Sequence, residues 1–209
     1  MNIFEHSKVL MNIAILCSGN GTNLQAIIDN VNKGYIPARI AFVLSDEKKA
    51  FALERAKKAG IKTVTLDKKD YKNREDFDRE IVKHLKKRNV ELVVLAGFMR
   101  LLSPYFIKEY RNRIINIHPA LLPSFKGPHG IKDAIDHGVK VTGVTVHFVD
   151  EDLDNGPIIF QRTVEIKEDD TEEALLERVH KKEHEVYPEA IKLLVEGKIK
   201  IEGRKVVIR

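Results

Sequence analysis

The sequence predicts an α/β fold in which a mostly parallel central sheet is flanked by helices. Two observations predict it. Four short apolar runs rich in Ile or Val lie in the first half of the chain, and buried parallel strands have this composition. Amphipathic stretches lie between these runs, and such an alternation of strand and helix is typical of βαβ units.

The first half is expected to supply four strands, at residues 12–17, 39–44, 62–66 and 91–95. A helix is expected to begin at the glycine-rich turn after the first strand. Phe77, Ile81 and Leu85 stand at four-residue spacing, so they predict a further helix over residues 74–88. The charged stretch at residues 67–71 is expected to be a solvated loop.

The second half is expected to add a helix near residues 131–137, a long helix from Thr171, and strands at residues 113–118, 141–149 and 157–166. A hairpin at residues 199–208 follows. Pro188 lies inside the long helix and is expected to kink it. No repeat or Gly/Ser linker divides the chain. We therefore expect one domain over residues 11–209, with residues 1–10 as an extension and two halves, 11–110 and 111–209, that share one sheet.

Composition limits the classes of partner. The chain has 36 Lys and Arg and 31 Asp and Glu, and the net charge of +5 suits anionic small ligands without requiring nucleic acid. The single cysteine, Cys17, excludes a disulfide framework and a multi-cysteine zinc site, and we expect it in the core. No apolar run approaches the roughly 20 residues of a membrane helix. Glu5, His6 and Lys8 stand where a signal peptide would be apolar, so a cytoplasmic protein without a membrane partner is expected.

The turn after the first strand reads Ser-Gly-Asn-Gly-Thr-Asn-Leu-Gln over residues 18–25. Its two glycines allow close approach of the backbone, and Thr22 with Gln25 predicts a capping box at a helix N-terminus. Free backbone N–H groups and the helix dipole favour an anion there, and the side chains of Asn20, Thr22 and Asn23 offer further donors.

A phosphate monoester fits this turn better than a dinucleotide does. A dinucleotide fingerprint would need glycine at position 24, where Leu24 stands, and a P-loop would need Gly-Lys-Ser/Thr. Both are absent. A plain strand-to-helix turn without a ligand is the alternative.

Two polar residues interrupt the apolar strand at residues 113–118. The two-residue period of a strand places Asn116 and His118 on one face and Ile115 and Ile117 on the other. An amide donor beside an imidazole can stabilise an oxyanion and transfer a proton, as acyl-type transfer requires. No serine or cysteine stands in a nucleophile elbow, so the substrate is expected to supply the attacking atom. The alternative is a core Asn and His that are satisfied by their neighbours.

An acidic loop separates the last two predicted strands of the sheet. Asp150, Asp152 and Asp154 match the first three EF-hand positions. Asn155 stands where glycine is needed, however, and Gln161 stands where the bidentate glutamate is needed. Calcium is therefore not expected.

The same loop can serve His118. A carboxylate close to this histidine would stabilise the protonated ring, and Asp154, beside an Asn-Gly-Pro turn, is the expected one. On the preceding strand Thr145, His147 and Val149 share one face. His147 therefore either approaches the same cleft or is simply packed.

A carboxylate also lies on the apolar stripe of the long helix. Steps of 3.6 residues from Leu176 lead to His180, Glu183, Tyr187 and Leu194. Because an unpaired buried charge is costly, Glu183 must be paired, for example with an arginine, or must meet a polar ligand such as sugar hydroxyls.

Together these motifs resemble the phosphoribosylglycinamide formyltransferase family, the folate-dependent enzymes of purine synthesis, from residue 11 to about residue 197. The motifs are Ser-Gly-Asn-Gly-Thr-Asn at 18–23, Leu-Ala-Gly-Phe-Met-Arg-Leu-Leu-Ser-Pro at 95–104, Asn-Ile-His-Pro-Ala-Leu-Leu-Pro at 116–123, Val-Thr-Val-His-Phe-Val at 144–149 and Asp-Asn-Gly-Pro at 154–157. The resemblance implies a Rossmann-like formyltransferase fold. It also implies transfer of the formyl group of 10-formyltetrahydrofolate, a co-substrate, to the amine of 5-phosphoribosylglycinamide, with no metal.

The resemblance further implies roles for individual residues. His118 would transfer the proton, Asn116 would orient the formyl group and its oxyanion, and Asp154 would support the charged histidine. The ribonucleotide is expected at Gly21, Thr22, Asn23, His180, Lys181, Lys182 and Glu183. The folate is expected at Arg74, Met99, Arg100, Leu101, Leu102, Asn116, Asp150, Glu151, Asp152, Leu153 and Asp154. The expected partners are thus two small molecules, and the protein is expected to be a monomer or a homodimer.

Other functions share parts of this pattern. Formyltetrahydrofolate hydrolases share the Asn-His-Asp core but carry an amino-terminal regulatory domain, and methionyl-tRNA formyltransferases carry a carboxy-terminal domain for RNA; neither domain is expected in this chain. A nucleotide-binding module without chemistry would use only the glycine turn. Lys126 departs from the family, whose members usually carry proline there, which bears on the loop and not on the proposed chemistry.

Overall fold

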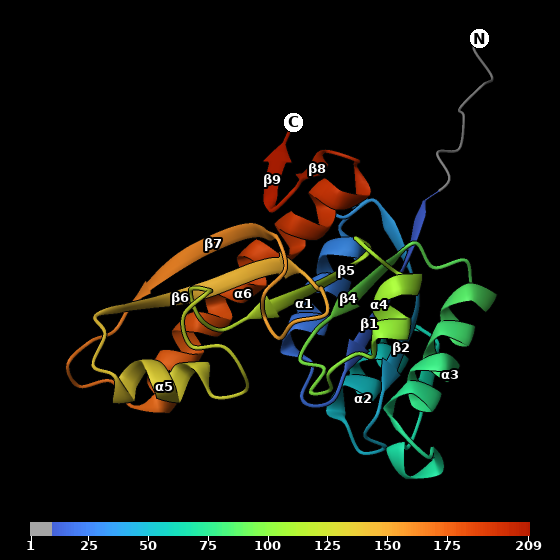
Figure 1. Ribbon diagram of the computed structural model, residues 1–209, viewed down its shortest axis with the longest axis horizontal. Coiled ribbons are helices and arrows are strands. Elements are labelled where there is room, and N and C mark those ends of the chain that lie inside the picture. Colours follow the sequence, from blue (N-terminus) through green and yellow to red (C-terminus); the bar gives the residue numbers. More distant parts are fainter. Residues whose placement is uncertain (1–9) are drawn as a thin grey trace.

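The computed structural model describes residues 10–209, which form an α/β fold around one seven-stranded sheet (Figure 1). The strand order is β3-β2-β1-β4-β5-β6-β7. Strands β1 to β5 pair in parallel, whereas β6 is antiparallel to β5 and to β7. The mostly parallel sheet and its sharing by both halves of the chain are therefore confirmed. The strands are β1 (Met11–Cys17), β2 (Ala38–Ser45), β3 (Thr63–Thr65), β4 (Leu92–Leu95), β5 (Ile114–His118), β6 (Val141–Phe148) and β7 (Ile158–Glu165).

Helices cover both faces of the sheet, because alternate residues of the central strands are apolar on both sides. On β1, Ile13 and Ile15 join the core beneath α1 and α6, while Ala14 and Leu16 join the core beneath α3 and α4 (Figure 1). The helices are α1 (Thr22–Asn32), α2 (Phe51–Lys58), α3 (Arg74–Lys87), α4 (Pro104–Glu109), α5 (Gly130–Asp136) and α6 (Glu172–Val195). The last two strands, β8 (Ile199–Glu202) and β9 (Lys205–Ile208), form a separate hairpin.

The single cysteine is confirmed as a core residue. Cys17 is fully buried at the end of β1, and its thiol donates to the carbonyl oxygen of Leu44 at 3.6 Å. Burial raises the pKa of this thiol to about 12, so it stays protonated at neutral pH.

Some expectations on local structure were wrong or incomplete. Residues 67–71 are more than a loop, because Asp67 accepts a hydrogen bond from the Lys69 N–H at 3.0 Å and so caps a 3-10 helix, η1 (Lys68–Asp70). The sequence analysis also did not locate α2 or α4. Pro188 lies inside α6, and the kink expected there stays a prediction. Of the expected extension, residues 1–9 lie outside the described residues. Within residues 10–209, no helix is long and apolar enough to cross a membrane.

The topology creates a crevice at the carboxyl ends of the parallel strands. Strands β2 and β3 lie on one side of β1, and β4 lies on the other side, so the strand order reverses at β1. In open α/β sheets, ligands bind at the carboxyl ends of the strands where such a reversal occurs. The loops after β1 and β4 meet there, because the Ser18 N–H donates to the carbonyl oxygen of Gly97 at 3.0 Å. This is the edge of the sheet at which the candidate site lies.

Candidate active site

A polar patch lies on one face of the β5–β6 pair. The antiparallel register places Asn116 opposite His147 and His118 opposite Thr145. Because opposite residues of an antiparallel pair lie on the same face, these four side chains form one surface. The predicted alternation on β5 is confirmed, and His147 does approach the same site.

His118 is held by acceptors on both ring nitrogens. The ring is only 4% exposed, its Nε2 lies 2.8 Å from the carbonyl oxygen of Phe125, and its Nδ1 lies 3.5 Å from Asp154 Oδ2. A carbonyl and a carboxylate can only accept, so each N–H of a protonated ring would face an acceptor. Both ring nitrogens of His118 therefore face acceptors in this site.

Asp154 reaches the histidines because its loop turns sharply back over the sheet. Its backbone is in the left-handed region (φ 46°), and its Oδ2 accepts a hydrogen bond from the Gly127 N–H at 2.8 Å. A side chain at Gly156 would place its Cβ 1.9 Å from the carbonyl oxygen of Phe148, so only glycine fits this turn. Asp154 Oδ1 lies 3.8 Å from His147 Nε2, and the side chain is 9% exposed. The carboxylate thus lies between the two rings.

His147 determines which way the Asn116 amide faces. Its Nδ1 lies 2.8 Å from the carbonyl oxygen of Phe148, so Nδ1 must carry the hydrogen. The lone pair of Nε2 then accepts from Asn116 Nδ2 at 3.4 Å. Burial lowers the pKa of His147, which keeps the ring neutral and this pattern in place. The second Nδ2 hydrogen of Asn116 is left for another acceptor.

Two further polar residues anchor the segment that follows His118. The Thr145 hydroxyl donates to the carbonyl oxygen of Ala120 at 2.7 Å and accepts from the Leu122 N–H at 3.0 Å. Gln161, opposite Thr145 on β7, donates to the carbonyl oxygen of Leu122 at 2.9 Å. Neither residue was predicted from the sequence to belong to the site, although the two-residue period of β6 places Thr145 on the same face as His147.

The glycine turn leads into α1, but the predicted capping box was wrong. Gly21 is the N-cap in the left-handed conformation (φ 75°), Thr22 is already helical, and no side chain caps the helix. Gln25 instead donates to Asp29 and accepts from Arg55. Because no side chain uses the N–H groups of the first turn, they are free to bind an anion.

Glu183 is buried and paired, though not with an arginine. Its Oε2 accepts hydrogen bonds from Asn23 Nδ2 at 2.9 Å and from His180 Nδ1 at 2.8 Å, and the side chain is 4% exposed. The hydrogen bond to Glu183 raises the pKa of His180. The predicted ribonucleotide residues of α1 and α6 are thus in direct contact. Asn23 Oδ1, however, is buried without a hydrogen-bond partner among residues 10–209.

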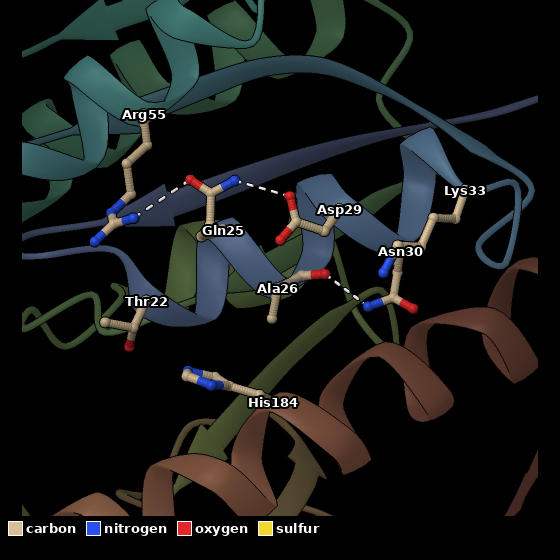
Figure 2. Close-up of a pocket in the computed structure, with 8 residues that line it drawn as sticks. All are labelled: Thr22, Gln25, Ala26, Asp29, Asn30, Lys33, Arg55 and His184. Carbon is tan, nitrogen blue, oxygen red and sulfur yellow. Dashed lines mark hydrogen bonds between the residues drawn. The ribbon is translucent and has the colours of Figure 1, made fainter.

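A cavity of about 400 Å³ opens beside this contact, between α1, α2 and α6 (Figure 2). In the figure the His184 ring points toward Thr22 across the opening. Arg55 lines the cavity and braces the glycine turn, since its Nε donates to the carbonyl oxygen of Asn20 at 2.9 Å. Arg55 and the Gln25 amide therefore lie at the start of α1, while Asp29 and Lys33 line the cavity further along the helix.

The side chains of the residues expected to bind folate differ in exposure and in contacts. Met99, Leu101 and Leu153 are apolar yet 72%, 55% and 47% exposed, as expected of side chains that a ligand would cover. The Arg100 guanidinium lies 4.4 Å from the centre of the Phe77 ring.

The other residues predicted to bind the two substrates range from partly buried to exposed. Leu102 is partly buried against the core beneath α3 and α4, and Arg74 lines a second cavity of about 420 Å³. Lys181 is exposed, and Lys182 forms an ion pair with Glu185 at 2.8 Å. The acidic loop residues Glu151 and Asp152 are exposed, and Asp150 Oδ1 accepts from the Asp152 N–H at 3.2 Å. The binding roles of these residues stay predictions.

Comparisons with known proteins agree with this architecture. The family model described as Formyl transferase matches residues 11–191. The phosphoribosylglycinamide formyltransferase of Escherichia coli (strain K12) is 44% identical over 191 residues, which cover 91% of this chain and 90% of that protein. The crystal structure of glycinamide ribonucleotide transformylase 1 from Symbiobacterium toebii has a TM-score of 0.94 and 48% identity, and the match covers 95% of this chain and 94% of that one.

Longer relatives match as well. The trifunctional purine biosynthetic protein adenosine-3 of Homo sapiens is 43% identical over 96% of this chain. The chain spans only 14% to 20% of the length of the trifunctional relatives that it matches. The chain therefore belongs to the formyl transferase family, and it is similar over most of their length to the phosphoribosylglycinamide formyltransferases of Escherichia coli (strain K12) and Bacillus subtilis (strain 168).

Proposed function

We propose that this chain transfers the formyl group of 10-formyltetrahydrofolate to the amine of 5-phosphoribosylglycinamide in purine biosynthesis. One observation carries the proposal. Asn116, His118 and Asp154 meet at the carboxyl ends of the parallel strands, the same edge of the sheet at which α1 begins with an uncapped N-terminus. The cluster offers an amide donor, a proton carrier and a carboxylate, and the helix N-terminus offers an anion site.

Asn116 and His118 would stabilise charge on the formyl oxygen. When the substrate amine adds to the formyl carbon, a C–N bond forms and the oxygen gains negative charge. Asn116 would donate through the Nδ2 hydrogen that His147 does not engage, and His118 would donate through Nε2 once that nitrogen has taken the proton of the amine. Preorganised donors of this kind typically contribute about 100 to 1,000-fold to the rate.

His118 would also move the proton. The attacking amine loses one proton, and the folate nitrogen gains one when its bond to the formyl carbon breaks. His118 can take the first and supply the second, while Asp154, 3.5 Å away, stabilises the charged ring in between. Protons balance over the cycle without any further acid or base.

In the structure His118 Nε2 is engaged by the carbonyl oxygen of Phe125 at 2.8 Å. Phe125 lies in the segment between β5 and α5 and has a positive φ of 52°. This carbonyl must withdraw before a substrate oxygen can accept from Nε2. We therefore expect the 119–129 segment to shift when both substrates bind.

The ribonucleotide would bind with its phosphate at the first turn of α1. The N–H groups of Thr22 and Asn23 would donate to it, as orphan donors at a helix N-terminus commonly do. Glu183 would accept from ribose hydroxyls in addition to its present donors. Arg55 and the other basic groups of the cavity would add attraction for the phosphate.

The proposed reaction involves two small molecules and no nucleic acid. It would take place in the cytoplasm, in a monomer or a homodimer. Within residues 10–209, no three His, Cys, Asp or Glu side chains are grouped to hold a metal ion. The proposed steps use only side chains of this chain, so full activity is expected after dialysis against EDTA, and loss of activity restored by a divalent cation would contradict the proposed chemistry.

The absorbance change of 10-formyl-5,8-dideazafolate tests the function directly. A change that requires 5-phosphoribosylglycinamide is the expected result. Formate release without the ribonucleotide would indicate a hydrolase. Binding of both ligands with no transfer at any pH would favour a binding module.

A further inference from the structure

A polar link that the proposed chemistry does not use connects three neighbouring strands at the crevice. The Ser18 hydroxyl donates to Asp46 Oδ1 at 2.6 Å and accepts from the Met99 N–H at 3.0 Å. The Ser18 N–H also donates to the carbonyl oxygen of Gly97 at 3.0 Å. Ser18 therefore ties the loop after β1 to the loop after β4.

The direction of these hydrogen bonds is fixed by their chemistry. A hydroxyl has one hydrogen, and here it is donated to the carboxylate of Asp46, the first residue after β2. The lone pairs of the Ser18 oxygen are then left to accept from the Met99 N–H. Asp46 is only 7% exposed, so solvent competes little for this carboxylate.

The loop after β4 is anchored on the far side of its tip by Arg100, which lies 4.4 Å from the centre of the Phe77 ring, and by Leu102, which packs against the core beneath α3 and α4. The side chains of Met99 and Leu101 are 72% and 55% exposed, so they do not pack into the core. Phe98 is buried and Gly97 has a positive φ of 72°, which sets the start of the turn. At the tip itself, between Phe98 and these two anchors, the hydrogen bond from the Met99 N–H to Ser18 therefore holds the backbone.

We propose that Ser18 and Asp46 are positioning residues that hold residues 97–102 in the shape that receives the formyl donor. The inference rests on the proposed function, which places the folate at this loop. Ser18 acts through the backbone of Met99, and Asp46 acts through Ser18. Neither residue needs to touch a substrate.

The glycine turn is held by contacts that do not involve the Ser18 hydroxyl, so loss of this hydroxyl should affect the loop after β4 and not the anion site. The carbonyl oxygen of Gly19 accepts from the Ala52 N–H at 3.1 Å, and that of Asn20 accepts from Arg55 Nε at 2.9 Å. Gly21 packs directly on Ala52. Removing the Ser18 hydroxyl leaves all of these contacts, so the anion site should remain while the folate loop loosens.

The test compares KM values for the two substrates in four variants. Ser18→Ala and Asp46→Ala are expected to raise the KM of the formyl donor by about tenfold, the effect of losing one or two hydrogen bonds. The KM of the ribonucleotide and kcat should stay within about twofold of wild type. Asp46→Asn keeps an acceptor oxygen for the Ser18 hydroxyl, so its KM for the formyl donor should equal that of the wild type.

Ser45→Ala is the matched control. Ser45 is buried beside Asp46, but among residues 10–209 its hydroxyl bonds only to the backbone of Glu47, at 3.2 and 3.1 Å. This variant loses a similar pair of hydrogen bonds and should leave both KM values unchanged. Equal rises of both KM values in Ser18→Ala, or a KM of the formyl donor that does not change, would overturn the proposal.

Amide hydrogen exchange separates this inference from the proposed function. The Met99 N–H should exchange slowly in the wild type and at least about tenfold faster in Ser18→Ala, because opening no longer breaks a hydrogen bond. Asp46→Ala keeps the Ser18 hydroxyl but removes the carboxylate that orients it, so the exchange rate should rise by a smaller factor in that variant. An unchanged exchange rate would overturn the link even in an active enzyme. A wild-type protein that transfers no formyl group would overturn the proposed function, while the exchange result would still decide whether Ser18 holds the loop.

Discussion

Replacing Gly21 by alanine should destabilise the protein, because the position has neither the conformation nor the space for a side chain. Its φ is 75°, and an added Cβ would lie 2.7 Å from the Cβ and 2.9 Å from the Cα of Ala52. A left-handed backbone costs a non-glycine residue about 1 to 2 kcal/mol. Overpacking adds about 1 to 3 kcal/mol, and the backbone atom of Ala52 cannot move without α2. We expect the free energy of unfolding to fall by about 2 to 5 kcal/mol.

Chemical denaturation and steady-state kinetics measure this effect. If the turn binds the phosphate, the shift of α1 against α2 should also raise the KM of the ribonucleotide by about tenfold or more, with little change in the KM of the formyl donor. Gly19→Ala is the matched control, since no atom lies within 4 Å of a Cβ there and its φ is not positive. A Gly21→Ala variant that matched Gly19→Ala in stability and in KM would refute the reasoning about this turn.

Three further predictions concern buried polar groups. Asn116→Ala should lower kcat by about 100-fold or more with a smaller change in KM, as loss of an oxyanion donor does; a wild-type kcat would exclude that role. Glu183 raises the pKa of His180 above 6.5, so this pair stabilises the fold below pH 6.5 and loses that effect as pH rises through the raised pKa. The melting temperatures of wild type and Glu183→Gln should accordingly differ most in acid and converge at alkaline pH, whereas a gap that grew with pH would contradict the assignment. Tyr187→Phe should lower the free energy of unfolding by about 1 kcal/mol in urea titrations, because it deletes a buried hydrogen bond of 2.7 Å to the carbonyl oxygen of Leu95; no loss would mean that this bond is not formed.

The sequence predicted the sheet well because its signals are local and periodic. The apolar runs of the parallel strands stand out from charged helices, and the observed strands begin and end within one or two residues of the expected ones. The two-residue period on β5 also placed Asn116 and His118 on one face before any contact was known. Short helices such as α4 carry too few residues for a period, and its cap at Ser103 was not recognised.

The predicted capping box was wrong because the prediction considered the spacing of Thr22 and Gln25 and not the conformation of the preceding glycine. Thr22 and Gln25 have the right spacing, but the left-handed Gly21 already serves as the N-cap and makes Thr22 helical. An added Cβ at Gly21 would also meet Ala52 on another helix, a contact that the local motif does not indicate. The consequence is functional, since an uncapped helix keeps its N–H groups for a ligand.

Contacts between distant loops could not be derived from residue patterns. The link from Met99 to Ser18 spans 81 residues and uses a backbone N–H, which has no sequence signature. The tautomer of His147 depends on a carbonyl of the following residue and on Asn116 in another strand. The pairing of Glu183 with Asn23 spans 160 residues, and the sequence indicated only that some partner was needed.

The central claim is that His118 and Asp154 act together on the formyl group, and a double-mutant cycle on single-turnover formyl transfer tests it most directly. Residues that act as a unit show strongly non-additive losses. The account predicts that the variant carrying both His118→Ala and Asp154→Asn is no slower than His118→Ala alone, because Asp154 works only through the charged ring. Independent losses that multiply in the double variant would contradict it.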